Sequence, residues 1–244
     1  EGWLRRGLVQ CPDGPAAVRG KALFVWGALA AVRGEFAFAE ARLLDAVALL
    51  NDGPDISSLA LAETSLGVSA LYSGKPDVAL AALHRAERLY PLAQTMAARA
   101  LGAFSQCQLV MARHLLRPAP DDADDLSQAV ERVREFGSRL TLLPALSMKA
   151  TVNWNLGDVA KAASIWREAL TLAWAEGERW LAVDPLFGIA AAFAEQDEPR
   201  TALRLLGAVD ACCVATGTVP LIAGAMTARI EQRAAAALDE AEIS

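Results

Sequence analysis

Aromatic residues, histidines and cysteines are scarce in this chain of 244 residues. It has 7 Phe, 6 Trp, 2 Tyr, 2 His and 4 Cys, whereas Ala and Leu number 52 and 35. Alanine and leucine favour helices, and strands are built mainly from β-branched and aromatic residues. The composition therefore argues against an all-β fold and predicts packed helices.

An excess of positive charge and a long apolar run are also missing. Lys and Arg number 23 against 29 Asp and Glu, so the formal net charge is -6. The longest uncharged apolar run, Ala22 to Val32, has eleven residues, and a membrane-spanning helix needs about 20. We therefore expect no direct contact with nucleic acid and no insertion into a membrane.

The four cysteines, Cys11, Cys107, Cys212 and Cys213, show no CxxC spacing. Adjacent cysteines on a helix point about 100° apart, which would strain a bridge between them. We expect reduced thiols in a cytoplasmic protein. The chain opens at Glu1 with no initiator Met and no basic, then apolar leader, so we expect a piece of a longer protein.

One phrase recurs along the chain: a turn with a small residue, usually Gly, and then a helix that carries alanine. Its copies cover residues 33–47, 73–87, 156–170 and 196–209. An irregular copy between the second and third has Ala129 as its counterpart. The aligned alanines, and the small residues that stand twelve positions before them, are Ala39, Ala79, Ala162 and Ala202, and Gly27, Gly67, Ala150 and Ala190.

Each copy predicts the turn of a hairpin made of two antiparallel helices. Glycine readily adopts the left-handed conformation that ends a helix. The small residues in each pair let the two helix backbones approach closely. Four residues after the alanines come larger residues, which we expect to pack against the next pair: Leu43, Leu83, Trp166 and Leu206.

This spacing resembles that of tetratricopeptide repeats, with a step of 40 residues instead of the usual 34. The opening EGWLRRGL (1–8) and the closing segment 201–238 resemble the solenoid of MalT-like and LuxR/AfsR-type transcription regulators. The resemblance implies an all-α, right-handed superhelical solenoid of antiparallel helix pairs. It also implies an ATPase domain, and a DNA-binding domain, outside this segment.

The breakers at Pro12–Pro15, Asp52–Pro54, Pro118–Pro120 and Thr216–Pro220 agree with this arrangement. We expect one continuous solenoid over 1–244. Its expected parts are a remnant helix at 1–9, helix pairs at 15–51, 57–90, 92–137, 141–176 and 179–215, and a terminal capping helix at 220–240.

The first helices of the pairs should line a concave groove. Repeat phase places nine side chains on it that could bind a ligand or partner, and they are nearly uncharged: Phe24, Thr64, Val68, Tyr72, Ser147, Thr151, Trp154, Asn155 and Phe187. The alternative is that these residues are merely the packed inside of a tight superhelix.

No arrangement of residues predicts catalysis, a metal or a cofactor. Asp121–Asp125 formally matches the DDxxD magnesium motif of all-α isoprenoid enzymes, but carboxylates that follow RPAP and begin a helix are explained by the helix dipole. His84 and His114 have no Cys or second His at metal-ligand spacing.

We therefore expect a non-catalytic sensor and protein-interaction module of a bacterial transcription regulator. Its groove would bind a protein, a peptide or a small effector, and the chain could form a homo-oligomer. The alternatives are a stand-alone peptide-binding adaptor and, more remotely, an isoprenoid enzyme that uses Asp121–Asp125.

Overall fold

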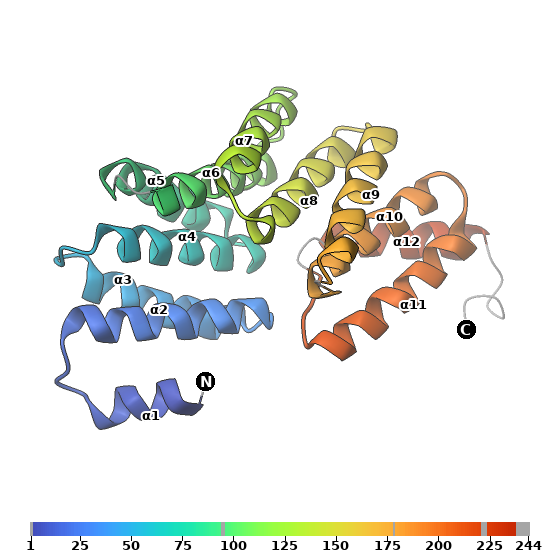
Figure 1. Ribbon diagram of the computed structural model, residues 1–244. Coiled ribbons are helices and arrows are strands. Elements are labelled where there is room, and N and C mark those ends of the chain that lie inside the picture. The colour runs from blue at the N-terminus through green and yellow to red at the C-terminus, as the bar shows by residue number, and fades with distance from the viewer. Residues whose placement is uncertain (1, 94–95, 178, 221–223, 238–244) are drawn as a thin grey trace. The chain divides into compact units, whose positions relative to one another are not determined.

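The chain is built from helices (Figure 1). The computed structural model describes residues 2–93, 96–177, 179–220 and 224–237, and within these ranges it contains no strand. This confirms the predicted all-α class. The helices are α1 (Gly2–Gln10), α2 (Ala16–Val32), α3 (Phe36–Leu50), α4 (Ile56–Tyr72), α5 (Pro76–Ala93), α6 (Met96–Leu116), α7 (Asp122–Phe136), α8 (Arg139–Asn155), α9 (Val159–Ala175), η1 (Arg179–Ala182), α10 (Val183–Glu195), α11 (Pro199–Thr216) and α12 (Gly224–Ala237).

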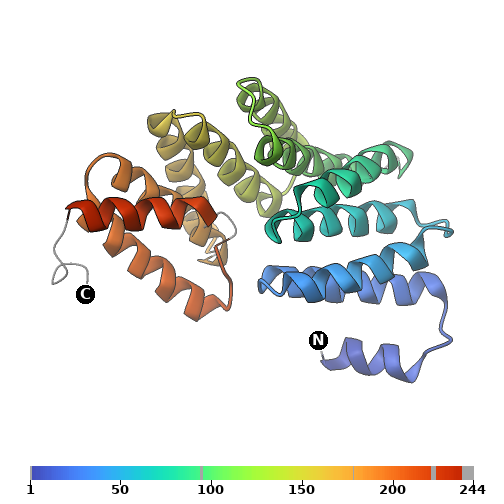
Figure 2. The same ribbon diagram turned by 180° about the vertical axis from the view of Figure 1, so that it is seen from behind.

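The helices form two compact units. The N-terminal unit comprises residues 1–119 and 131–138, and the C-terminal unit comprises residues 120–130 and 139–244. In the N-terminal unit α2, α3, α4 and α5 each pack against the helix that follows, as both views show (Figures 1 and 2). In the C-terminal unit α8, α9, α10 and α11 do the same. One continuous solenoid over 1–244 stays a prediction.

The turn inside each hairpin has the same construction in both units. Gly34, Gly74 and Gly157 have φ values of 77°, 72° and 92°, in the left-handed region. The residue after each glycine donates its N–H to a carbonyl five residues earlier, as Lys75 does to Ala70 over 2.8 Å. In the fourth copy Asp197 takes the glycine's place with φ 58°. Asp is among the few non-glycine residues that tolerate this conformation.

Glycine lets the first two hairpins close tightly. A Cβ atom on Gly27 would lie 2.7 Å from Cγ of Leu43, and one on Gly67 would lie 2.6 Å from Cγ of Leu83. Because glycine has no side chain, each leucine can occupy the space beside the glycine of its own helix pair. Leu43 also packs with Leu66 and Ala82 of the next pair. The repeat-packing alanines Ala39, Ala79, Ala150, Ala162, Ala190 and Ala202 are all fully buried.

Trp166 solves the same packing problem differently. Its pair has Ala150 instead of glycine, and the indole lies flat against Gly188 on α10, the first helix of the next pair. A Cβ atom on Gly188 would be 2.1 Å from the indole ring. Trp166 itself is fully buried. Here the large residue packs against the next pair, as the sequence predicts, and a glycine outside the repeat pattern makes room for it.

The third expected pair, residues 92–137, differs from the others. The whole of α6 belongs to the N-terminal unit, whereas α7 is divided between the units after Val130. Twelve residues before Ala129 stands Arg117, which follows the end of α6 at Leu116. This pair therefore lacks the small helical residue that lets two backbones approach in the first two pairs.

The N-terminus of α4 is held by Asp55. Its carboxylate accepts a hydrogen bond from the N–H of Ser58 over 3.0 Å and pairs with Lys21 on α2 at 2.5 Å. The hydrogen bond from Lys21, followed by those from Ser58, lowers the pKa of Asp55 from 3.8 to about 2. One side chain therefore caps a helix and links two first helices.

No helix in the described part of the chain is long and apolar enough to cross a membrane.

Gly188→Ala tests the contact with Trp166. The added methyl group would overlap the indole, so we expect the free energy of unfolding to fall by about 3 kcal/mol, the upper end for overpacking. Gly207→Ala on α11 is the matched control, because a Cβ there meets nothing within 4 Å. It should raise stability by up to about 1 kcal/mol through helix propensity. Urea unfolding followed by circular dichroism measures both, and equal effects would contradict the packing described.

Asp55→Asn tests the ion pair with Lys21. Asparagine is also a good N-cap, so the variant loses mainly the charge, and we expect a loss of under about 1 kcal/mol at pH 7. Because the pKa of Asp55 is lowered on folding, its stabilisation is present above pH 4 and is lost as the pH falls toward 2. The two proteins should therefore converge in urea midpoint over that range. Asp52→Asn, at an exposed position away from Lys21, is the control.

Candidate functional site

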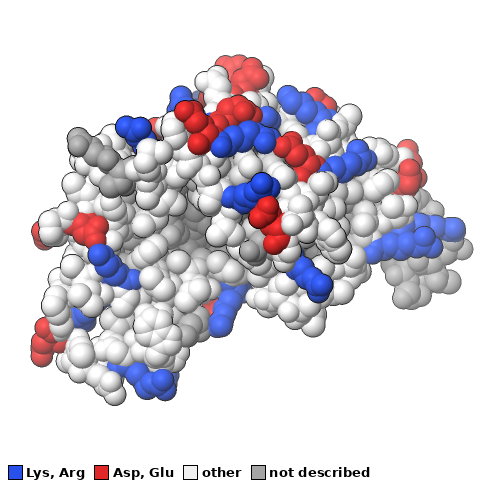
Figure 3. Space-filling view, in the orientation of Figure 1, with Lys and Arg blue, Asp and Glu red and all other residues white. Residues whose placement is uncertain are grey.

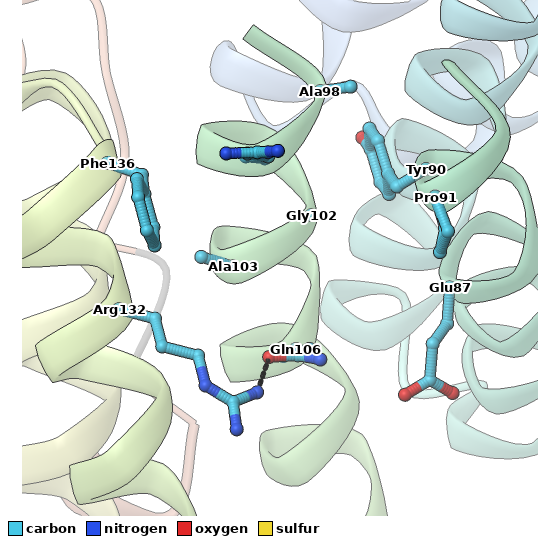
Figure 4. Close-up of a pocket in the computed structure, with 10 residues that line it drawn as sticks. Glu87, Tyr90, Pro91, Ala98, Gly102, Ala103, Gln106, Arg132 and Phe136 are labelled. Atoms are coloured by element: carbon cyan, nitrogen blue, oxygen red, sulfur yellow. Dashed lines mark hydrogen bonds between the residues drawn. The ribbon is translucent and has the colours of Figure 1, made fainter. Parts of the chain in front are cut away.

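In the N-terminal unit, three helices enclose a pocket of about 250 Å³, which we call the α6 pocket (Figure 4). Spacings of three and four residues place its lining on one stripe of each helix. The lining residues are Glu87, Tyr90 and Pro91 of α5, Ala98, Arg99, Gly102, Ala103 and Gln106 of α6, and Arg132 and Phe136 of α7.

Small residues of α6 form the floor of the pocket. Gly102 and Ala103 lie at its centre, with the side chains of α5 and α7 standing on either side (Figure 4). A Cβ atom on Gly102 would lie 3.2 Å from Cβ of Tyr90. The pocket therefore exists because the residues of α6 at its centre, Gly102 and Ala103, have no side chain or only a methyl group.

The ring of Tyr90 forms one wall of the pocket, and a hydrogen bond to α4 holds it in place. Its hydroxyl lies 2.9 Å from that of Thr64 on α4, and the Thr64 hydroxyl donates to the carbonyl of Ala60 over 2.9 Å. Tyr90 is 6% exposed, and burial raises its pKa to about 12. The ring is thus a neutral, fixed wall, and Phe136 stands across α6 from it (Figure 4).

The other end of the pocket is polar. Arg132 donates a hydrogen bond to Oε1 of Gln106 over 2.7 Å, and Glu87 stands on the opposite side of α6 (Figure 4). Glu87 lies 3.5 Å from Nδ1 of His84. Arg99 and Arg132 are both exposed, and neither forms an ion pair with any residue that the structure describes. Two guanidinium groups are therefore available to a ligand.

The face shown in Figure 3 carries no large patch of one charge sign. In the view of Figure 3, Lys and Arg lie interspersed with Asp and Glu, and large areas carry no charge. Uncharged apolar side chains are exposed on α2, among them Val25, Leu29 and Val32. The α6 pocket combines aromatic walls with two arginines that form no ion pair in the part of the chain that the structure describes.

The structure divides the nine predicted groove residues between the two units. Five of them are buried, at most 7% exposed: Thr64, Ser147, Thr151, Trp154 and Phe187. Phe24, Val68 and Tyr72 are half-buried, and Asn155 is exposed. The five buried side chains pack within the chain, which favours the alternative of a packed interior at these positions, and their role in binding stays a prediction.

Contacts within the chain account for the burial of several of these side chains. The hydroxyl of Thr64 is hydrogen-bonded to the carbonyl of Ala60 and the hydroxyl of Tyr90. Thr151 donates to the carbonyl of Ser147 over 2.9 Å. Trp154 is covered by Arg229 of α12, whose guanidinium lies 4.8 Å from the ring centroid. The ring of Tyr72 stacks on that of Phe36 at 6.0 Å. The groove on the first helices stays a prediction.

The acidic stretch behaves as a helix start. α7 begins at Asp122, and its first turn contains Asp122, Asp124 and Asp125, where the helix dipole favours negative charge. Among the residues described, no group of three His, Cys, Asp or Glu side chains could hold a metal ion. All four cysteines are free thiols, and burial raises the pKa of Cys107 to about 12.

Comparison by sequence finds no matching family model and no matching curated protein. Solved structures do match. A Rap protein in complex with Competence and Sporulation Factor aligns with a TM-score of 0.68 and 12% identity over 85% of this chain. BtubC (BKLC) from P. vanneervenii aligns at 0.59 and 15% identity, over 88% of this chain and 87% of that one. A putative kinesin light chain of Podospora anserina, with nearly identical TPR-like repeats, aligns at 0.55 and 16% identity, over 84% and 98%.

The chain has a tetratricopeptide-like fold. This confirms the predicted helical solenoid, and at these identities the likeness extends to the fold alone. The chain spans 57% of the length of the Rap protein.

Sequence reasoning missed the α6 pocket. One signal for it was present, because Arg99, Gly102, Ala103 and Gln106 share one face of α6. That face mixes small, cationic and amide residues, unlike a buried face. Which helices flank it depends on how α5 and α7 pack, and the repeat pattern breaks down at α7.

Thr64→Val tests the support of the Tyr90 wall. The variant leaves the buried Tyr90 hydroxyl without its partner, which should lower the free energy of unfolding by about 1–3 kcal/mol. Tyr90→Phe removes the hydroxyl instead. Because the double variant leaves neither group unpaired, it should be more stable than the sum of the single losses predicts. Urea unfolding of the four proteins completes the cycle, and simple additivity would contradict the described bond.

Proposed function

We propose that the chain is a protein-interaction module, without catalysis of its own, that binds a segment of a partner protein in the α6 pocket. The observation that carries this proposal is the pocket itself, which has fixed aromatic walls and two unpaired guanidinium groups on a tetratricopeptide-like fold. The match to a Rap protein in complex with a factor supports a binding role.

The size of the pocket favours a segment over a free small molecule. Pockets that enclose drug-sized ligands measure about 300–1,000 Å³, and this one measures about 250 Å³. It can take one or two side chains of a chain that otherwise lies outside it. The exposed ends of Glu87 and Arg132 can then hydrogen-bond the segment's backbone.

We propose further that the module is the sensor region of a bacterial transcription regulator. The resemblance of residues 1–8 and 201–238 to the ends of such solenoids supports this. An ATPase domain and a DNA-binding domain of the same protein would then be its partners, and binding would shift the equilibrium between inhibited and oligomerising forms. A stand-alone peptide-binding adaptor is the second candidate, because the α6 pocket would serve that role equally.

Hydrogen exchange separates a small effector from a peptide. A peptide should protect α5, α6 and the end of α7 around the pocket. A small effector in the groove predicted on the first helices should instead protect residues around Tyr72 in the N-terminal unit or around Trp154 in the C-terminal unit.

Peptide selection tests the binding function directly. A phage library of random 12-residue peptides is selected on the immobilised chain, and the enriched peptides are synthesised and measured by fluorescence polarisation. Phe136→Ala removes one wall of the pocket and should weaken binding at least ten-fold, the loss typical of an anchoring contact. Phe104→Ala, also half-buried on α6 but outside the lining, is the matched control. Failure to enrich any peptide, or equal effects of both variants, would overturn the proposal.

A further inference from the structure

We infer that the α6 pocket selects a peptide segment in which one Asp or Glu stands beside an apolar or aromatic side chain. This inference rests on the proposed function and adds the chemistry of the ligand. Its basis is one small site that combines aromatic walls with two guanidinium groups, neither of which forms an ion pair with a described residue.

Two arginines supply the positive charge of the pocket. Arg132 is oriented by its 2.7 Å hydrogen bond to Gln106, whose neutral amide leaves the positive charge uncompensated. Arg99 lies on α6, one helical turn before Gly102 and Ala103, and has no ion-pair partner among the described residues. Guanidinium groups recognise carboxylates through paired, charge-assisted hydrogen bonds. Each of these two arginines therefore lacks an acidic partner that a ligand could supply.

The number of charges favours a carboxylate over a phosphate. The lining contains Arg99, Arg132 and Glu87, a formal charge of +1. One carboxylate neutralises it, whereas a phosphate dianion would leave an excess negative charge close to Glu87. Glu87 stands across α6 from Arg132 (Figure 4), so it would repel a second negative charge.

The aromatic walls favour an apolar side chain next to the acidic residue of the bound segment. Tyr90, Pro91 and Phe136 form an apolar end of the pocket, and Tyr90 cannot rotate without breaking its bond to Thr64. An apolar side chain between these walls would remove aromatic surface from water, at little ordering cost to the protein. The same segment would thus place its acidic group at one of the two arginines and its apolar group between the aromatic walls.

Three peptide pools test the inference. All are blocked 12-residue peptides with random flanks and one fixed central residue, which is Glu, Gln or phosphoserine. Retention on the immobilised chain is quantified by mass spectrometry. The Glu pool should be retained at least five-fold over the Gln pool, and this preference should shrink between 50 and 500 mM salt, because exposed charges are screened. Among the retained Glu peptides, aromatic and aliphatic residues should be enriched next to the fixed position.

Variants assign the preference to the two arginines. In the double variant Arg99→Gln, Arg132→Gln the preference for the Glu pool over the Gln pool should disappear. The variant Arg88→Gln should keep this preference, because Arg88 is exposed on α5 outside the pocket. Both lining arginines are exposed, and circular dichroism checks that each variant is folded.

The outcomes distinguish the two proposals. Equal retention of the Glu and Gln pools, both lost in Phe136→Ala, would overturn the acidic ligand and leave peptide binding standing. Stronger retention of the phosphoserine pool would overturn the carboxylate in favour of phosphate. No retention of any pool would overturn the peptide-binding function itself.

Discussion

The close approach of two helices at a glycine is the contact on which the hairpins depend. Gly27 and Gly67 present bare backbone to the partner helix, and Leu43 and Leu83 occupy the space that a side chain would take. Because packing in a protein interior is dense, one methyl group at such a crossing forces the helices apart. The left-handed residue in each turn keeps the two helices aligned for this contact.

The α6 pocket is lined by both helices of the pair in which that contact is missing, together with α5. Arg117 stands where the other pairs have a small helical residue, and the division between the two units passes through α7. The small residues of α6, Gly102 and Ala103, instead form the floor of an open pocket between α5 and α7. The irregular repeat is thus the origin of the candidate site. Departures from regular packing are where function is often found.

Thr64 links the core to the site. It is buried on α4, yet its hydroxyl group positions the ring of Tyr90, which forms a wall of the pocket. Its polar character follows from this hydrogen bond, since a buried hydroxyl is costly unless it is paired. A buried polar residue on a first helix can therefore shape a ligand site that it does not touch.

Composition and repeat spacing alone determined the all-α class, the positions of the turns and the small residues at the tight crossings. These are local properties: a glycine twelve residues before an alanine, with a turn between them, defines a hairpin wherever it occurs. Only the tertiary structure decided which side chains remain open. Thr64 and Phe187 have the phase of groove residues but are buried, and Thr64 bonds to Tyr90, which is 26 residues away in the sequence. Arg99 and Phe136 come together because α7 departs from the repeat, and a pattern read from repeats contains no information about the place where it stops.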